Sequence, residues 1–245
     1  MVSAGARIAL VSEVTIPAFY QGLPVLMIAG NAFKDCVNLK VINFPKTVEQ
    51  ISSISPFAGC INLKEVNVYG VDGVNSARYW SRDGVLFDNG TSSESGAKIA
   101  YMPLAKSGTY RIPDEVTEIP EIAFMNSALS KIIVPASVTR IGNDAFTNCT
   151  NLTSIVFEAT TSGQAEKPLA IGKRAFNGCS ALESIALPAR LTDIALVKYI
   201  VTGDEIVING VDNAFTGCQS LKSVSIASNS KHYKSDDGVI YSHDG

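Results

Sequence analysis

The chain has 245 residues, 46% of them hydrophobic and 18% charged, with a formal net charge of −3. The apolar fraction is enough for a continuous core, and the acidic balance argues against nucleic acid as a partner. No apolar stretch reaches the roughly 18 to 20 residues that a membrane-spanning helix needs, so we expect no membrane insertion by this chain. Residues 1–10 do not have the pattern of a signal peptide.

An Ala-Phe pair followed by cysteine recurs along the chain and marks an internal repeat. Successive phenylalanines lie 22 or 24 residues apart where the repeat is undisturbed, and longer spacings indicate insertions. The six copies are Ala32-Phe33 with Cys36, Pro56-Phe57 with Cys60, Ala123-Phe124 with Ser127, Ala145-Phe146 with Cys149, Ala175-Phe176 with Cys179, and Ala214-Phe215 with Cys218.

Each copy leads into a pattern of leucine-x-x-apolar-x-apolar, often followed by proline, as in Leu39, Ile42, Phe44 and Pro45. The apolar-x-apolar spacing predicts a short strand with one buried face. The proline ends that strand because it has no N–H to donate. Apolar residues three and six positions after the proline predict a second short strand or a tighter turn. The Ala-Phe-x-x-Cys spacing predicts a short helical turn.

One such repeat cannot hide its apolar side, but stacked copies can, with their strands in a parallel ladder. The order of these elements resembles the BspA-like leucine-rich repeats, also called the Treponema pallidum type. We therefore predict an α/β repeat fold. It is a single leucine-rich-repeat solenoid over residues 1–245, with repeats from about 25 to 226, short helical turns and inserted hairpins. The resemblance implies a secreted or cell-surface protein associated with adhesion.

Inserts interrupt the repeat at about residues 71–110, 159–167 and 195–208. In the first, Asp83-Gly84-Val85-Leu86-Phe87 and Ile99-Ala100-Tyr101 flank a stretch rich in glycine and serine, which predicts a hairpin. In the third, the apolar residues 191–201 are expected to form a helix.

The motif Asp237-Gly238-Val239-Ile240-Tyr241 repeats the beginning of the first insert close to the end of the chain. Residues 232–245 are therefore interpreted as a truncated hairpin. On this basis we expect the natural protein to continue past Gly245.

All five cysteines occupy the same repeat position. Stacked neighbours such as Cys36 and Cys60 could lie about 5 Å apart, a distance that a disulfide would allow. Their odd number and the lack of C-x-x-C pairs favour small, buried, unreactive thiols instead. Ser127 agrees with this, because a hydroxyl can replace a packed thiol but not a bridge.

No motif for catalysis, cofactor binding or metal ligation is recognisable. His232 and His243 lie near no nucleophile motif, and the carboxylates Glu118 and Glu121 are interpreted as part of a solvated face. We therefore expect no enzyme, no cofactor and no metal.

Two surfaces are candidates for binding. The first is the outward face of the strand ladder, and the second is the aromatic pair in the first insert. The candidate residues are Asn43, Glu65, Asn67, Lys131 and Ile133 on the ladder, and Tyr79 and Trp80 in the insert. A plain solvated sheet remains an alternative for the ladder, and a lone tryptophan can simply pack an insert onto its scaffold.

The sequence thus favours a non-enzymatic interaction or adhesion module that binds a host or matrix protein or a glycan. The alternative is a passive structural spacer or stalk that displays another domain of a longer protein.

Overall fold

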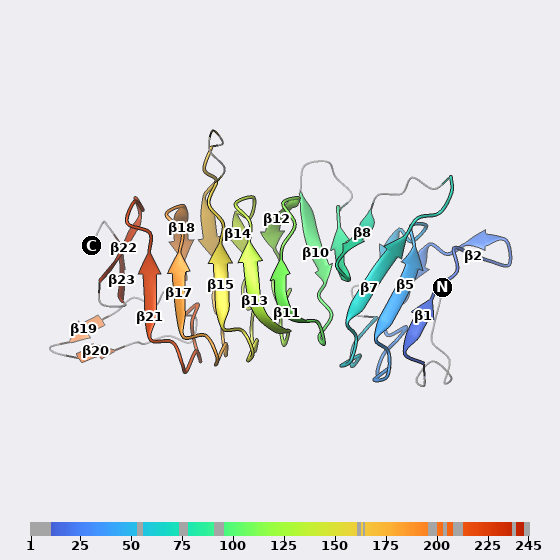
Figure 1. Cartoon of the computed structure of the whole chain (residues 1–245), viewed down its shortest axis with the longest axis horizontal. Helices are drawn as coiled ribbons and strands as arrows, with labels where there is room; N and C mark the ends of the chain where they lie inside the picture. Colours follow the sequence, from blue (N-terminus) through green and yellow to red (C-terminus); the bar gives the residue numbers. More distant parts are fainter. Residues whose placement is uncertain are drawn as a thin grey trace. The chain divides into compact units, whose positions relative to one another are not determined.

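The computed structural model describes residues 11–52, 56–73, 78–90, 96–160, 163, 165–195, 200–202, 205–207, 213–236 and 239–242. The chain divides into two compact units, Met1–Lys106 and Ser107–Gly245, which are described one after the other. Each unit is a stack of repeat turns with short strands in parallel ladders (Figure 1). A single solenoid over the full chain stays a prediction.

The ladder of the first unit consists of β1 (Glu13–Thr15), β5 (Val41–Pro45) and β7 (Glu65–Tyr69), paired in parallel in that order. Val14, Ile42 and Val66 lie in register, and the last two are fully buried. The predicted strands, with alternate residues facing the core, are therefore confirmed. A second pair of parallel strands, β4 (Met27–Ile28) and β6 (Gln50–Ile51), follows the proline turns.

Two antiparallel inserts extend the first unit. The strands β2 (Phe19–Tyr20) and β3 (Leu23–Pro24) form a hairpin closed by Gln21 and Gly22, both with positive φ. The strands β8 (Tyr79–Arg82), β9 (Val85–Asp88) and β10 (Ala97–Tyr101) form a three-stranded meander. The β9–β10 hairpin confirms the prediction for the first insert. Strand β8 was missed, although an Asp-Gly pair between two apolar segments is a hairpin signal.

The second unit repeats the plan with two sets of parallel strands. The ladder strands are β11 (Ser107–Arg111), β13 (Ala128–Val134), β15 (Ser154–Phe157), β17 (Ser184–Leu187) and β21 (Ser223–Ile226). They lie side by side in Figure 1. The strands after the prolines are β12 (Val116–Ile119), β14 (Arg140–Ile141), β16 (Leu169–Ile171) and β18 (Leu191–Ile194), also parallel.

Two hairpins complete the second unit. One pairs β19 (Ile200–Thr202) with β20 (Glu205–Val207), and the other pairs β22 (Tyr233–Asp236) with β23 (Val239–Ser242). A helix over residues 191–201 is the wrong prediction, because Leu191–Ile194 and Ile200–Thr202 are strands; residues 196–199 lie outside the described residues. Leu191 and Ile194 continue a strand column that already exists in the stack.

The predicted short helical turns are also wrong, since the described residues contain turns but no helix. The residue before each cysteine, or before Ser127, has a positive φ. These residues are Asp35 (58°), Gly59 (76°), Asn126 (61°), Asn148 (58°), Gly178 (70°) and Gly217 (71°). A left-handed residue stops a helix after one turn.

The amides of these turns bond along the stack instead of along a helix. The Phe146 N–H donates to the Ala175 carbonyl at 2.7 Å, and the Asn148 N–H donates to the Asn177 carbonyl at the same distance. Each turn is thereby tied to the next repeat, and its backbone donors are satisfied without helical bonds.

The core of each unit is a column of stacked rings. Phe146 lies between Phe124 and Phe176, with ring centroids 4.8 and 5.4 Å away. In the first unit Phe57 lies between Phe33 at 6.0 Å and Tyr101 at 4.8 Å. These phenylalanines are at most 1% exposed, which places the repeated Ala-Phe element in the interior.

Candidate functional site

The column of cysteine side chains forms hydrogen bonds between successive repeats. Four of the five thiols donate to the phenylalanine carbonyl of the preceding repeat. The pairs are Cys60 with Phe33 at 2.9 Å, Cys149 with Phe124 at 3.0 Å, Cys179 with Phe146 at 3.2 Å and Cys218 with Phe176 at 3.1 Å. Four of the five cysteines are buried, and Cys218 is half-buried. Burial raises the pKa of the Cys60 thiol to about 11, so the thiol stays protonated and unreactive at neutral pH.

The described part of the chain contains no group of three or more His, Cys, Asp or Glu side chains arranged to hold a metal ion. A helix with the length and apolar character to span a membrane is likewise not found in that part. The carboxylates Glu118 and Glu121 both bond to the next repeat. Glu118 pairs with Arg140, and Glu121 accepts a bond from Asn143 at 3.0 Å.

The ladder face of the first unit carries a connected row of polar side chains, which we call the amide row: Glu13, Thr15, Asn43, Glu65 and Asn67. The Asn43 amide donates to Glu13 at 3.0 Å and to Thr15 at 3.1 Å. The Asn67 amide donates to Asn43 at 3.1 Å and lies 3.4 Å from Glu65. Three of the predicted surface residues, Asn43, Glu65 and Asn67, are therefore brought together. Their mutual bonds hold the side chains in fixed positions.

The meander β8–β10 borders the amide row. A Cβ added at Gly84 would lie 2.8 Å from the Glu65 side chain, and the Val66 N–H donates to the Gly84 carbonyl at 2.8 Å. The turn of the insert thus packs directly on β7 and covers the free edge of that strand.

The aromatic pair of this insert is mainly structural. Tyr79 is 5% exposed, and its hydroxyl accepts a bond from the Ile51 N–H at 3.3 Å. Trp80 stacks on buried Phe87 with ring centroids 4.2 Å apart, and the guanidinium of Arg82 lies 5.2 Å from the Trp80 ring. Tyr79 is thus removed from any binding surface, and the half-buried Trp80 has much of its ring already in contact.

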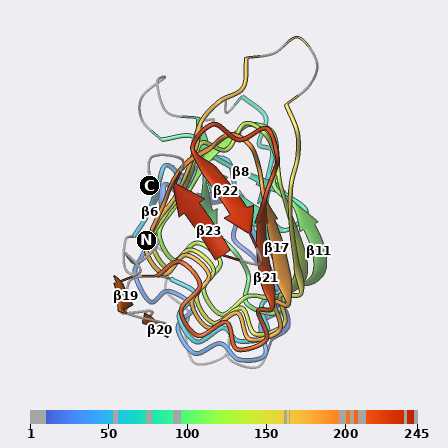
Figure 2. The same cartoon turned by 90° about the vertical axis from the view of Figure 1, so that its left-hand side faces the viewer.

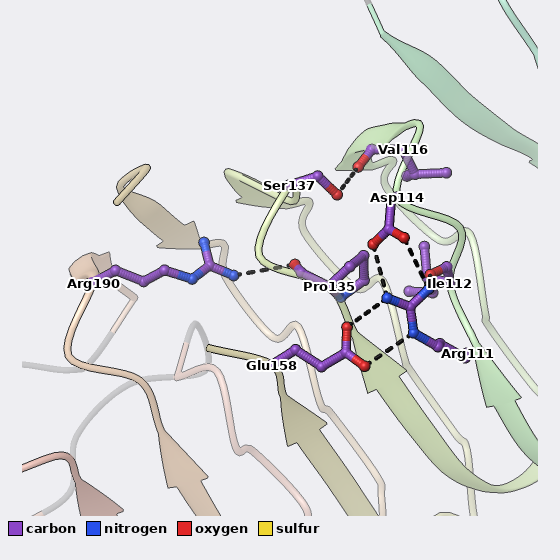
Figure 3. A network of polar contacts seen from close by, with 8 residues as sticks. All are labelled: Arg111, Ile112, Asp114, Val116, Pro135, Ser137, Glu158 and Arg190. Atoms are coloured by element: carbon purple, nitrogen blue, oxygen red, sulfur yellow. Dashed lines mark hydrogen bonds and ion pairs between the residues drawn. The ribbon is translucent and has the colours of Figure 1, made fainter. Parts of the chain in front are cut away.

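The ladder face of the second unit differs in character. Lys131 and Ile133 are half-buried on β13, and Ile133 lies in register with Val156 of β15, which is 38% exposed. Beside this apolar pair, Arg111 makes a two-pronged ion pair with Glu158 at 2.7 and 2.9 Å (Figure 3). Glu158, and then Asp114, raises the pKa of the Arg111 guanidinium, which remains a fixed cation.

Figure 3 also shows a buried arginine in the second unit. Arg190 is 4% exposed, and its guanidinium donates to the Val138 carbonyl at 2.6 Å and to the Pro135 carbonyl at 3.4 Å. In an undisturbed repeat a hydroxyl occupies this position, as Ser137 donates to Val116 at 2.8 Å. The repeat between them has Pro168 there, which cannot donate. Arg190 therefore reaches past the insert at 159–167 to the carbonyl left without a donor.

A group of neighbouring exposed apolar side chains in the first unit was missed in the sequence. The β2–β3 hairpin and the residue after it carry Phe19 at 52%, Tyr20 at 66%, Leu23 at 70% and Leu26 at 44% exposure. We call this group the apolar hairpin. Two signals could have identified it. Residues 14–33 contain no charged side chain, and the proline-to-valine spacing is eight residues from Pro17 to Val25 but three from Pro45 to Val48.

The family profile described as "BspA type Leucine rich repeat region" matches the chain in six copies, over residues 23–78, 102–195 and 165–236. No curated protein matches it in sequence.

Solved structures show the same fold. A leucine rich cell surface protein from Faecalibacterium prausnitzii A2-165 is 23% identical with a TM-score of 0.50, over 88% of this chain and 60% of its own. The pneumococcal vaccine antigen PcpA is 21% identical with a TM-score of 0.52, over 89% and 58%. This chain therefore matches about three fifths of the length of either relative.

Proposed function

Since the chain belongs to the BspA-type leucine-rich-repeat family, we propose that it is a non-enzymatic interaction module of a secreted or cell-surface protein. The partner proposed is a protein with a neutral, apolar docking surface. The site is the apolar hairpin of the first unit. The proposed secreted or cell-surface location is inferred from the family to which the chain belongs.

One observation carries this proposal, namely the exposure of the apolar hairpin. Phe19, Tyr20 and Leu23 are each more than half exposed, and both residues of β2 and both residues of β3 are exposed to solvent. A two-stranded hairpin of this size gains little stability in water by itself. Apolar groups left in such a cluster mark contact sites for proteins.

The surroundings of the hairpin indicate the chemistry of the partner. Residues 14–33 carry no charge, so the hairpin offers nothing to a strongly charged ligand. Phe19 and Tyr20, at about 150–250 Å² for a whole aromatic side chain, expose roughly 200 Å² together. This area is well below the roughly 800 Å² per partner of a standard interface. The hairpin therefore fits a pocket on a partner better than the flat face of a second copy.

The amide row favours a second candidate, a glycan. Its amide and carboxylate groups are mutually bonded and partly exposed, which suits recognition of hydroxyl groups. This alternative uses the ladder face of the same unit and makes a separate prediction.

The test is a binding screen of the whole chain against arrayed extracellular-matrix proteins and arrayed glycans, with two variants. In one, Phe19, Tyr20 and Leu23 are changed to serine. In the other, Asn43 and Asn67 are changed to alanine. Asn62→Ala is the matched control, because Asn62 is an exposed asparagine that also bonds between repeats but lies off the ladder strands.

Saturable binding to a matrix protein that only the serine variant abolishes is the expected result. Binding to a glycan that only the double alanine variant abolishes would establish the second candidate. Binding that survives both variants would place the site elsewhere. The lack of any binding at high protein concentration would favour the passive spacer.

A further inference from the structure

The base of the apolar hairpin is bonded to the next repeat on both sides. On the outgoing side the Ile16 N–H donates to the Asn43 carbonyl at 2.8 Å. On the returning side the Leu26 carbonyl accepts bonds from the Glu49 and Gln50 N–H groups at 2.8 and 3.1 Å. Figure 1 shows β2 projecting beyond β1, on the side away from β5 and β7. The exposed tip therefore extends from a fixed base.

One bond at this base comes from a more distant strand. The Tyr69 hydroxyl, at the end of β7, donates to the Ile16 carbonyl at 2.6 Å, across 53 positions of the sequence. Tyr69 lies opposite Pro45 in the ladder, so its side chain crosses β5 to reach the residue that follows β1. Burial raises the pKa of the Tyr69 hydroxyl, and a backbone bond with Ala18 offsets part of this rise. The hydroxyl therefore remains a donor at neutral pH.

The proline pattern of the repeat explains why this donor is needed. Equivalent positions of the repeats stack in columns, as the ladder strands β11, β17 and β21 of the second unit do in Figure 2. The Val134 carbonyl precedes a proline and accepts a bond from the Glu158 N–H of the next repeat at 2.9 Å. The Ile16 carbonyl also precedes a proline, but the donor position of its next repeat is Pro45, which has no N–H. The Tyr69 hydroxyl supplies the missing donor.

The second unit contains a related arrangement. The Ile112 carbonyl has Pro135 at the donor position of the next repeat, and the Arg111 guanidinium lies 3.5 Å from it. The same guanidinium pairs with Glu158, which holds the repeat position of Tyr69. In each unit the side chain at this position thus reaches back over a proline to the repeat two before. In the second unit it fixes a side chain of the ladder, whereas in the first it fixes the base of the hairpin.

We propose that Tyr69 is a positioning residue of the apolar hairpin and fixes the direction in which Phe19, Tyr20 and Leu23 are presented to a partner. This inference rests on the proposed function, because it describes how the same site is held in one orientation before a partner binds. A two-stranded hairpin is marginally stable by itself, so its orientation depends on contacts at its base. An ordered hairpin binds without the entropy loss that ordering would require.

The first test needs no partner. Tyr69→Phe removes the hydroxyl and keeps the ring. The Val25 N–H closes the hairpin on the Ala18 carbonyl at 2.9 Å, and its hydrogen exchange is expected to become roughly fivefold faster in this variant. The Lys46 N–H, which donates to the Tyr69 carbonyl at 3.0 Å, should exchange as before, because the ladder itself is unchanged.

Tyr79→Phe is the matched control for this test. The Tyr79 hydroxyl also bonds to one backbone group of the first unit, the Ile51 N–H, but not to the hairpin. Its loss should leave the exchange of the Val25 N–H unchanged. Unchanged Val25 exchange in Tyr69→Phe, or an equal increase in both variants, would overturn the positioning role.

The second test separates positioning from direct contact. Binding kinetics are measured on each arrayed extracellular-matrix protein that the wild type binds. A hairpin that adopts the binding orientation only part of the time lowers the apparent affinity by that fraction. In Tyr69→Phe the association rate constant should therefore fall roughly fivefold while the dissociation rate constant stays the same. Phe19→Ser, which removes a contact, should mainly speed dissociation.

The outcomes distinguish this inference from the proposed function. If binding requires Phe19 but has the same kinetics in Tyr69→Phe, or if Tyr69→Phe only speeds dissociation, the positioning role is refuted and the proposed function stands. If no matrix protein binds the wild type, the proposed function fails. The exchange of the Val25 N–H then decides by itself whether Tyr69 holds the hairpin.

Discussion

The ladder faces of the two units are built from the same repeat pattern, but their exposed side chains differ in chemistry. On β5 and β7 the outward residues Asn43 and Asn67 bond to each other and to flanking carboxylates. On β13 and β15 the corresponding columns hold the apolar pair Ile133 and Val156, with an Arg111–Glu158 ion pair at their margin. The inward residues Ile42, Val66, Ile132 and Ile155 of the same strands are buried and aliphatic in both units.

This contrast separates what the fold requires from what it leaves open. The inward columns must be apolar, since they form a continuous core with the stacked phenylalanines. The outward columns have no such constraint, so the residues that select a partner can lie there or in the inserts. Large effects on stability should therefore fall on the shared interior, and small ones on the two faces.

The largest effect is expected from the phenylalanine column. Phe146→Ala in the second unit and Phe57→Ala in the first should each lower the free energy of unfolding by about 3–5 kcal/mol, through lost burial and the remaining cavity. Chemical denaturation followed by circular dichroism would measure this loss. Exposed Phe19→Ala is the control and should change the stability little. A cost for Phe146 no greater than for Phe19 would contradict the assigned core.

The next largest effect on stability is expected at the second residue after the proline of a repeat. Thr47 in the first unit donates to the Val25 carbonyl at 2.8 Å, as Ser137 does to Val116, whereas Arg190 spans an insert. Arg190→Ala should cost about 2–3 kcal/mol, because it leaves the Val138 carbonyl without this donor in the interior, and Thr47→Ala about 1 kcal/mol. Thermal unfolding of the two variants would rank them. Equal costs would show that water replaces the guanidinium.

A smaller effect is expected from the thiol column at high pH. Burial raises the pKa of Cys60 from 9.0 to about 11 in the folded protein. The thiol is protonated in both states below pH 9, so its contribution to stability is complete there. Above pH 9 the unfolded chain ionises first and unfolding is favoured, until the folded thiol ionises near pH 11.

The wild type should therefore lose stability relative to Cys60→Ala between pH 9 and 11, by at most about 1.4 kcal/mol per pH unit. Urea denaturation of both proteins at several pH values would show the difference. Parallel stability curves would mean that the folded thiol ionises as freely as the unfolded one. Labelling by a thiol reagent should be slow in the native state and begin at half-buried Cys218.

The smallest effect is expected on the ladder face of the second unit. Arg111 and Glu158 are partly exposed, so a double-mutant cycle with Arg111→Gln and Glu158→Gln should give a coupling of less than about 1 kcal/mol. The coupling should fall further in concentrated salt. A larger coupling that salt does not change would show that this ion pair belongs to the interior.

Much of the candidate surface could be predicted from alternation along single strands. The outward positions of Asn43, Glu65 and Asn67 follow from the two-residue period, and the structure confirms them. Trp80 and Tyr79 could not be assigned in this way, because their burial depends on how β8 folds against β9 and β6. The eight-residue spacing from Pro17 to Val25 could have identified the apolar hairpin as an insert. Its exposure could not be predicted, because a short apolar segment looks the same in sequence whether it is covered or exposed.

The sequence by itself determined the repeat, the buried columns and the ends of the ladder strands, because these depend on local spacing and on the chemistry of proline. The tertiary structure alone decided how successive repeats bond to each other. Turns expected to be helical direct their amides to the next repeat, thiols donate to carbonyls of the repeat before, and Arg190 reaches a carbonyl 52 residues away. These contacts join residues more than twenty positions apart, so they exist only once the repeats are stacked.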